Sequence, residues 1–142
     1  MKFVINSNRL MAALIKDASS RYVLFFPHFD FYAPDFLRDE LEKYKDEVQK
    51  KSKLTSTQFE KIYCDAINRI HLVPVSLFQE KLAEAEKIME KYDIKDSPFL
   101  AVYLVMKIDG IWSEDSHFSK QKICKIFSTH EMIRIIQTDN QK

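Results

Sequence analysis

Glycine is the residue that this sequence lacks most clearly, since only Gly110 among 142 residues is a glycine. Gly-rich phosphate loops need several glycines at fixed spacing, because backbone N–H groups must approach a phosphate closely. The sequence therefore excludes the dinucleotide-binding and P-loop classes of enzyme. Proline is also scarce, with four residues, and no linker rich in proline and glycine divides the chain. We expect a single domain over residues 1–142, which is close to the commonest domain size.

Cysteines and long hydrophobic runs are equally few. Cys64 and Cys124 lie far apart and form no CxxC or Cys/His pattern, so we expect two buried free thiols. The longest apolar run, Phe99–Met106, is far shorter than the roughly 20 residues of a membrane span. The amino terminus also lacks the apolar stretch and cleavage site of a signal peptide. We therefore expect a cytoplasmic protein that does not enter a membrane.

An excess of charge of one sign is absent too. The 22 basic and 21 acidic residues leave a net charge of +1, which does not by itself indicate a nucleic-acid-binding protein. Two local basic stretches exist, at Lys50–Lys53 and at Lys120, Lys122 and Lys125. Either could follow a phosphate backbone, but we interpret both as solvated surface. Hydrophobic residues at 46% and charged residues at 30% are typical of a globular domain.

What the sequence does contain is an alternation of short strand-like runs with helical patterns. We expect strands at residues 2–5, 29–33, 71–75, 111–113 and 123–127. Helices are expected around Leu10–Leu14, over Ser20–Phe26, from Pro34 through Val48, after Thr55, after Ser76, over Phe99–Met106 and after Ser128. Strands that alternate with helices predict a parallel sheet covered on both faces. The expected fold class is α/β, a three-layer α/β/α sandwich with a central parallel sheet.

Local signals define several helix ends. Three segments match the capping-box pattern at a helix amino end: Thr55–Gln58, Ser76–Gln79 and Ser128–Glu131. Pro34 suits the first turn of the next helix. Phe99–Met106 is apolar all round, which predicts a helix buried on every side.

Ligands of open parallel sheets bind outside the carboxyl ends of the strands, so polar residues at those positions are candidates for a site. Four residues lie just after an expected strand or early in an expected helix: Asn6, Glu40, Asp96 and Asp115. Capping of the following helix is the competing interpretation for three of them. Ser7 or Asn8 would cap the helix after Asn6, Asp96 stands ahead of Pro98, and Ser113 or Asp115 would cap a helix after 111–113.

Glu40 differs from the other three because it lies on an apolar stripe. Leu37, Leu41, Tyr44 and Val48 recur at helical spacing, and Glu40 shares that face. A carboxylate on a buried face must be paired, hydrogen-bonded or metal-bound. Besides a metal, the partners that the sequence offers are the guanidinium groups of Arg9, Arg21 and Arg38.

The four positions carry more weight together than singly. Carboxylates gathered at one end of a sheet repel one another and raise each other's pKa values unless a cation neutralises them. Oxygen ligands suit Mg²⁺ or Mn²⁺ rather than zinc. Such an ion can activate water and stabilise the charge on a phosphodiester during its hydrolysis. The set therefore indicates a metal-dependent enzyme that cuts nucleic acid.

Four segments of the sequence resemble the PIN domain, the fold of many metal-dependent ribonucleases, including VapC-type toxins. These segments are Phe3–Leu10, Ala33–Glu40, Asp96–Ala101 and Ile111–Phe118. The resemblance covers nearly the whole chain. It implies hydrolysis of single-stranded or structured RNA with one or two Mg²⁺ or Mn²⁺ ions, and it implies an antitoxin protein and a homodimer as partners.

Carried over position by position, the acidic quartet of the family falls on Asn6, Glu40, Asp96 and Asp115. The resemblance implies that these residues hold the metal, with Asn6 contributing an oxygen without a charge. The small hydroxyl residues that accompany the quartet fall on Ser7 and Ser113, which would orient ligands or the attacking water.

The departure from the family lies at Asn6, where an aspartate is usual. The amide keeps a carbonyl oxygen but loses the charge, so we expect weaker metal binding. An engineered change, a natural loss of activity and an active natural variant are all compatible with this residue. Because the other site residues persist, we favour a change confined to this position. We interpret His117 as a surface residue beside the site.

Three functions are compared on these grounds. The first is a metal-dependent endoribonuclease, acting as a toxin or in RNA processing. The second is a PIN-like module that lacks catalysis and binds RNA or protein. The third, a receiver-type signalling domain, is disfavoured because the sequence has no convincing match to its pattern, a phosphorylated Asp at the end of a central strand with a Lys further on. We interpret Trp112 as a residue that packs a strand against the core. Asp39 and Glu114 are interpreted as charged residues that face solvent.

Overall fold

The computed structural model describes residues 1–140, apart from the side chain of His117. The described residues form a five-stranded parallel sheet in the order β3-β2-β1-β4-β5. The strands are β1 (Lys2–Ile5), β2 (Asp30–Pro34), β3 (Ile70–Val73), β4 (Gly110–Trp112) and β5 (Ile126–Phe127). The chain builds outward from β1 through β2 to β3, and then returns to place β4 on the other side of β1. Strand order thus reverses between β1 and β4, where ligands of open parallel sheets bind.

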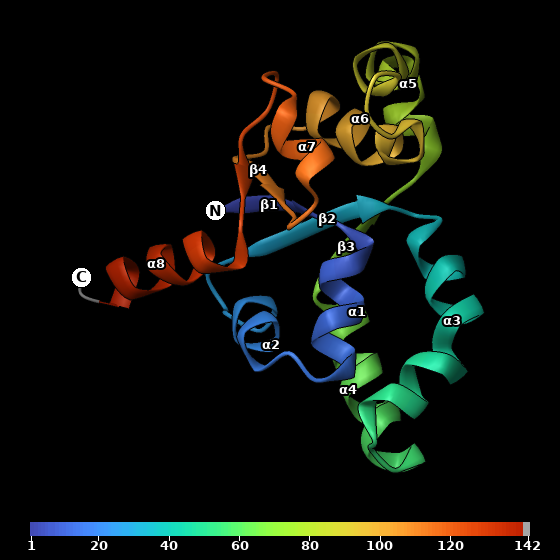
Figure 1. Ribbon diagram of the computed structural model, residues 1–142, viewed down its shortest axis with the longest axis vertical. Coiled ribbons are helices and arrows are strands. Elements are labelled where there is room, and N and C mark those ends of the chain that lie inside the picture. Colours follow the sequence, from blue (N-terminus) through green and yellow to red (C-terminus); the bar gives the residue numbers. More distant parts are fainter. Residues whose placement is uncertain (141–142) are drawn as a thin grey trace.

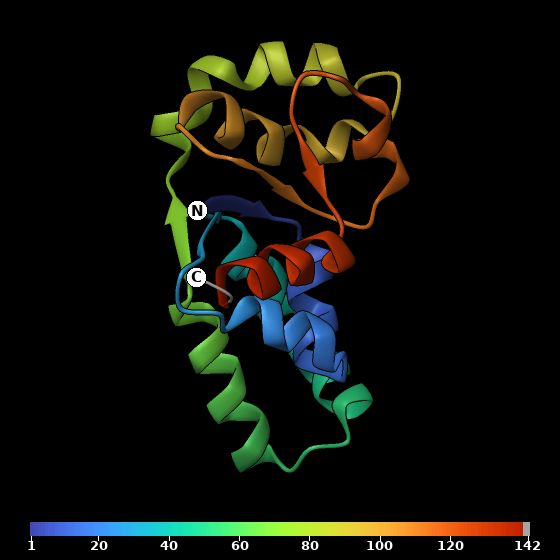
Figure 2. The ribbon, with the colours of Figure 1, turned by 90° about the vertical axis from the view of Figure 1, so that its left-hand side faces the viewer.

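Helices cover both faces of this sheet. They are α1 (Ser7–Ile15), α2 (Ala18–Leu24), α3 (Leu37–Ser52), α4 (Ser56–Asn68), α5 (Val75–Met89), η1 (Ile94–Asp96), α6 (Ser97–Val105), α7 (Ser116–Lys120) and α8 (Thr129–Asn140). In Figure 1, α5, α6 and α7 lie above the sheet, and α1 to α4 lie below it. Figure 2 shows α3 and α4 extending together away from the sheet. The expected three-layer α/β/α sandwich with a parallel sheet is confirmed.

Aromatic side chains fill the core on the sheet. The Phe3 ring lies 5.1 Å from the Phe29 ring, edge to face, and the Phe31 ring lies 5.5 Å from Trp112, measured between centroids. Trp112 is fully buried, and its indole N–H donates a hydrogen bond to Thr129 Oγ1 over 3.0 Å. Burial with a satisfied polar atom is what a core tryptophan requires. Trp112 is therefore a packing residue, as the sequence indicates.

Two of the three predicted capping boxes are confirmed. Thr55 and Gln58 exchange hydrogen bonds at the start of α4, and Ser128 and Glu131 do the same before α8. The prediction at Ser76 is wrong, because that residue lies inside α5 and no side chain caps this helix. Pro74 precedes α5 instead. It has no N–H to leave unpaired and its φ of −67° suits the start of a helix.

The predicted position of Pro34 in the first turn of a helix is also wrong. Pro34 is the last residue of β2, and α3 begins only at Leu37. Pro34 is in register with Val73 of β3, whereas the register of β2 with β1 ends at Tyr32. A proline is tolerated there because a strand paired on one side needs no N–H toward the other.

Four further expectations are corrected. Tyr44 is 38% exposed and so lies off the buried stripe of α3. The last strand is shorter than expected, and Ile123 lies outside it with 55% exposure. Cys64 is exposed, and only Cys124 is buried. In α6, Phe99–Val102 is buried but the residues from Tyr103 onward are only partly covered.

The longest apolar stretches give no membrane span. Among the helices of residues 1–140, none combines the length and the hydropathy that crossing a bilayer requires.

Candidate acidic site at the carboxyl edge of the sheet

A polar pocket of about 340 Å³ opens beyond the carboxyl ends of β1 and β2, beside the start of α6. Its lining residues are Asn6, Ser7, Asn8, Phe36, Glu40, Asp93, Lys95, Asp96, Phe99 and Asp115. The pocket brings together five of the six residues singled out from the sequence, which are Asn6, Ser7, Glu40, Asp96 and Asp115. They come from segments up to 109 positions apart in the chain.

Ser113 is the sixth residue, and it lies outside this pocket. It is 3% exposed and lines a neighbouring pocket of about 280 Å³, which shares Asp115 with the first. Its hydroxyl oxygen accepts a hydrogen bond from the Asp115 backbone N–H over 2.9 Å. Ser113 therefore shapes the turn that carries Asp115 from the end of β4 toward the pocket.

Asn6 joins β1 to α1. Its backbone N–H donates to the Trp112 carbonyl over 3.2 Å, and its side-chain oxygen accepts from the Asn8 N–H over 2.9 Å. The second bond makes Asn6 the cap of α1, a role that the sequence left to Ser7 or Asn8. The side chain is 4% exposed. The carbonyl oxygen that would face a cation is thus already bonded to a backbone donor.

Glu40 lies in the first turn of α3, where its carboxylate reaches back to the β1–α1 junction. Its Oε2 accepts a hydrogen bond from the Ser7 hydroxyl over 3.3 Å. One oxygen thus has a neutral donor rather than a cation. The hydrogen bond brings two of the expected site residues, 33 positions apart, into direct contact.

The three arginines proposed as partners of Glu40 are engaged elsewhere. Arg9 pairs with Asp17 at 4.0 Å, and Arg21 donates to the carbonyls of Ala13 and Leu14. Within residues 1–140, no ion pair of Glu40 is formed. The alternative that Glu40 serves a salt bridge is therefore not realised.

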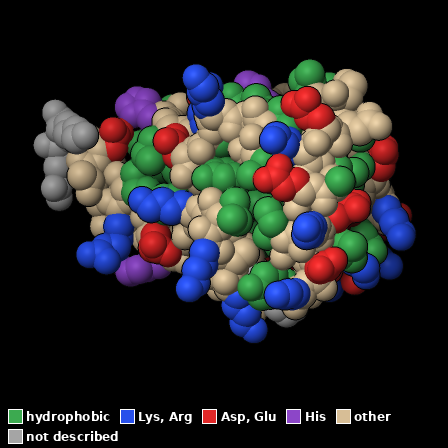
Figure 3. Space-filling model, turned by 90° about the horizontal axis from the view of Figure 1, so that it is seen from above, with side chains coloured by type: hydrophobic (Ala, Val, Ile, Leu, Met, Phe, Trp, Pro, Cys, Tyr) green, Lys and Arg blue, Asp and Glu red, His purple; other side chains and the backbone are tan. Residues whose placement is uncertain are grey.

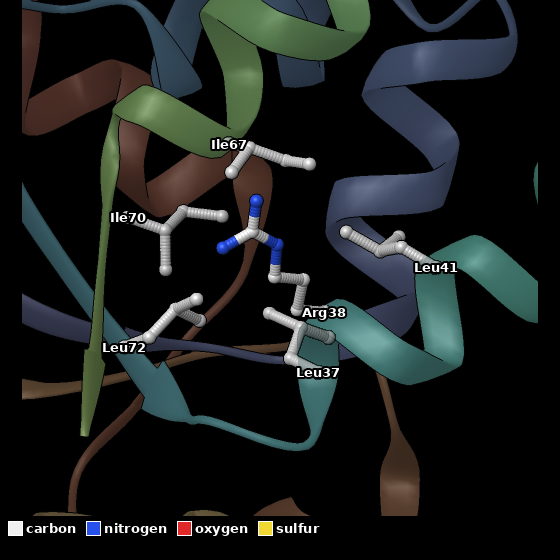
Figure 4. Close-up of a pocket in the computed structure, with 6 residues that line it drawn as sticks. All are labelled: Leu37, Arg38, Leu41, Ile67, Ile70 and Leu72. Atoms are coloured by element: carbon white, nitrogen blue, oxygen red, sulfur yellow. The ribbon is translucent and has the colours of Figure 1, made fainter. Parts of the chain in front are cut away.

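Arg38 lines another cavity and not the acidic pocket, and Figure 4 shows its side chain there. Its side chain extends toward Ile67 and Ile70 in a small cavity that Leu37, Leu41 and Leu72 complete. This cavity measures about 10 Å³, which is room for at most one water molecule. It is a packing gap between α3, α4 and β3 rather than a ligand site.

Asp96 precedes α6 but does not cap it. Its side chain makes no capping hydrogen bond, and its Oδ2 is buried without a hydrogen-bond partner among the described atoms. The capping interpretation is therefore wrong for this residue. A buried polar atom without a partner is costly, so an unpaired carboxylate oxygen on a residue that lines a polar pocket makes Asp96 a candidate ligand.

The surroundings of Asp96 raise its pKa from 3.8 to about 7. Burial is the largest cause, since it disfavours the charged form, and the negative charges of Asp93, Asp115 and Glu40 add to it. These carboxylates are thus close enough to repel one another. A bound cation would offset that repulsion and favour the ionised form of the Asp96 carboxyl.

Two charged residues of the pocket were missed by the sequence analysis. Asp93 accepts a hydrogen bond from the Lys95 N–H over 3.1 Å and so begins the 3-10 turn that ends at Asp96. Asp93 and Asp96 stand three residues apart in this turn, and that spacing was the available signal. Lys95 adds the one basic side chain among the lining residues.

The predictions for the charged residues beside the site are confirmed in part. Asp39 is exposed, as expected. Glu114 is exposed as well, but its Oε1 accepts a hydrogen bond from the Thr129 N–H over 2.6 Å at the start of α8. The side chain of His117 lies outside the described residues.

The chemistry of the pocket fits a hard cation, although its carboxylates are not gathered around one point. Its potential ligands are oxygens of Asn6, Glu40, Asp96 and Asp115, the type that Mg²⁺ and Mn²⁺ prefer. Across the described part of the chain, no group of three or more His, Cys, Asp or Glu side chains is arranged to hold a metal ion. Binding therefore requires these side chains to move inward against their mutual repulsion.

A family model described as "PIN domain" matches residues 4–135, a range that contains every lining residue of the acidic pocket. No curated protein matches the chain.

Proposed function

The chain belongs to the PIN domain family, and on this premise we propose that it is a metal-dependent endoribonuclease with activity weakened by Asn6. Proteins of this family are typically nucleases. The proposed reaction is hydrolysis of RNA phosphodiester bonds by a single domain in the cytoplasm.

The observation that carries the proposal is the state of Asp96. Its Oδ2 is buried and has no hydrogen-bond partner in the described structure, and Asp96 lines the same pocket as Glu40 and Asp115. A structural carboxylate would be expected to have a donor. A carboxylate that binds a cation is unpaired until the cation arrives.

We propose that Glu40, Asp96 and Asp115 hold Mg²⁺ or Mn²⁺, with Asn6 as a neutral fourth ligand. When bound, such an ion activates water and offsets the charge of the phosphodiester. Ser7 orients Glu40 through its hydrogen bond, and Ser113 orients the turn of Asp115. Lys95 supplies a positive charge for the substrate phosphate at the same pocket.

Asn6 weakens this site for two reasons. It contributes no charge to balance the cation, and its side-chain oxygen already accepts the Asn8 N–H. An aspartate has two carboxylate oxygens, so one can cap α1 while the other faces the ion. Restoring the acid should therefore restore cation binding without loss of the cap.

The test is titration of the purified chain with Mn²⁺ by calorimetry, beside Asn6→Asp. We expect weak binding by the parent and a gain of at least the roughly tenfold that even outer-shell partners contribute, together with RNA cleavage. Asn8→Asp is the matched control, because it adds the same charge to the same pocket two residues away. An equal gain in both variants, or none in Asn6→Asp, would contradict the proposal.

A second pair of variants tests the ligand assignment in the Asn6→Asp background. Glu40→Gln removes an assigned ligand, whereas Asp39→Asn removes an exposed charge from the preceding residue. We expect Glu40→Gln to abolish both Mn²⁺ binding and cleavage, and Asp39→Asn to preserve both.

The alternative is a catalytically silent module that binds RNA or protein. The neutral Asn6 and the lack of a gathered metal-binding group in residues 1–140 favour it. RNA binding without cleavage by Asn6→Asp in Mn²⁺ would establish this alternative.

We further propose a toxin role, with an antitoxin protein and a second copy of the chain as partners. A small reading frame immediately upstream that encodes a DNA-binding protein would support the antitoxin. Sedimentation of the purified chain measures the homodimer.

A further inference from the structure

A groove lies between α1 and α3, next to the acidic pocket. It measures about 330 Å³ and shares two lining residues, Asn8 and Glu40, with that pocket. A molecule bound at the acidic pocket can therefore continue into this groove without leaving the protein surface.

The groove offers an apolar wall with one aromatic ring. Met11, Ile15 and Val48 line it, and Tyr44 stands on α3 with 38% of its surface exposed. Tyr44 follows Glu40 by four residues, so it lies just over one helical turn, about 6 Å, farther along the same face. The Tyr44 ring therefore lies about one helical turn from Glu40 and from the proposed cleavage site.

Cations accompany this ring. Lys51 lines the same groove, and Lys43 Nζ lies 5.4 Å from the centre of the Tyr44 ring. Lys51 is held by Glu47 at 3.3 Å, one turn away on α3, and both side chains are well exposed. An exposed ion pair of this kind contributes little, so a phosphate group can replace the Glu47 carboxylate.

The outer face of the α5, α6 and α7 layer carries charges of both signs. In Figure 3, acidic and basic side chains are intermixed with hydrophobic ones across this face. The groove beside Glu40 combines continuity with the acidic pocket, a stacking ring and a cation.

We propose that this groove binds the nucleotide next to the cleaved bond of single-stranded RNA, with Tyr44 stacking on its base and Lys51 binding its phosphate. The proposal rests on the proposed function, whose substrate class it narrows. Stacking on an aromatic ring requires an unpaired base, so the groove selects single strands over duplexes. It also gives a preference for purines, which stack more strongly.

The experiment measures binding of a fluorescent short oligoadenylate to the parent chain by anisotropy, with Ca²⁺ present and the RNA checked for integrity. We expect Tyr44→Ala to weaken binding about tenfold, as loss of one base–aromatic stack does, and Tyr44→Phe to bind like the parent. Glu47→Gln should tighten binding because it frees Lys51. Lys51→Gln should weaken binding. It should also reduce the slope of log affinity against log salt concentration by about 1, the effect of losing one phosphate contact.

Tyr22→Ala is the matched control, because Tyr22 is a 49% exposed tyrosine on α2, outside the groove. Equal affinities of Tyr44→Ala and Tyr22→Ala, or no detectable binding by the parent, would overturn the proposal. So would sedimentation showing that Tyr44→Ala separates a dimer without changing RNA affinity, since the occupant would then be a second copy of the chain.

Failure of this proposal is distinguishable from failure of the nuclease. If Asn6→Asp cleaves RNA while Tyr44→Ala in that background leaves KM unchanged, the nuclease stands and the base-binding groove does not. If Asn6→Asp neither binds Mn²⁺ nor cleaves RNA, but Tyr44→Ala still weakens RNA binding, the groove binds RNA in a domain that is catalytically silent.

Discussion

The Ser7 hydroxyl donates a hydrogen bond to Glu40 Oε2 over 3.3 Å and so connects the start of α1 to the first turn of α3. The bond engages one oxygen of the carboxylate of a residue that lines the acidic pocket. Ser7 acts here as a positioning residue, because it reaches the proposed cation through Glu40.

Removal of this hydroxyl should weaken the cation site. In the Asn6→Asp background, we expect Ser7→Ala to lower Mn²⁺ affinity about tenfold, the usual effect of losing an outer-shell partner. Calorimetry measures the affinity. Ser19→Ala, which changes an exposed serine on α2, should leave it unchanged. A Ser7→Ala variant that binds Mn²⁺ like its parent would show that Glu40 needs no such support.

Asp96 should make stability depend on pH. Its pKa is about 7 in the folded chain and near 3.8 when it is unfolded, so between these values the folded state holds the proton more tightly. The free energy of unfolding therefore falls as pH rises from about 4 to about 7. Asp96→Asn has no carboxyl group to ionise, so its free energy of unfolding should not fall over this pH range for that reason. At pH 8 it should exceed the free energy of unfolding of the parent by about 1 kcal/mol, after allowance for solvent screening.

Urea unfolding of both proteins across this pH range measures the difference. Asp65→Asn, at an exposed position on α4, is the control and should follow the parent. A parent and an Asp96→Asn variant with parallel pH profiles would mean that the Asp96 carboxyl is not perturbed. Added Mn²⁺ should stabilise the Asn6→Asp variant at pH 8, because a ligand that binds only the folded state raises its stability.

Gly110 is required for steric reasons. A Cβ at this position would meet the Phe127 ring and lie 2.8 Å from the Lys125 carbonyl oxygen, which already accepts the Ile111 N–H. Gly110 does not have a positive φ, so the cost of a side chain is crowding between β4 and β5. We expect Gly110→Ala to lower the free energy of unfolding by about 1–3 kcal/mol.

Urea denaturation measures that loss as well. Lys107→Ala places an alanine at an exposed residue of the connection before β4, where its methyl group meets no crowding, and it should cost much less. Equal stabilities of the two variants would mean that β4 and β5 can separate slightly to admit a side chain at Gly110.

Interactions between near neighbours in the chain were predictable. The capping boxes at Thr55 and Ser128 need only two residues three positions apart, so the pattern and the structure agree. The Ser76 pattern failed because Pro74 starts α5 two residues earlier. A local signal is reliable only where no other local signal competes with it.

Partners that are distant in the chain were not predictable. The sequence offered Arg9, Arg21 and Arg38 to Glu40, but packing directs each of them elsewhere and leaves Ser7 as the partner. The apolar stripe of α3 likewise predicted a buried Tyr44, whereas the helix turns that ring outward into the groove beside α1.

The sequence by itself determined the alternation of strands and helices, and hence the parallel sheet and the edge at which polar residues collect. It did so because hydrophobic periodicity and helix capping act over a few residues. Only the tertiary structure decided that Asp96 has no donor, that Asp93 and Lys95 join the pocket, and that Glu40 meets Ser7. Those outcomes depend on which distant segments exclude water together, and no local pattern contains that information.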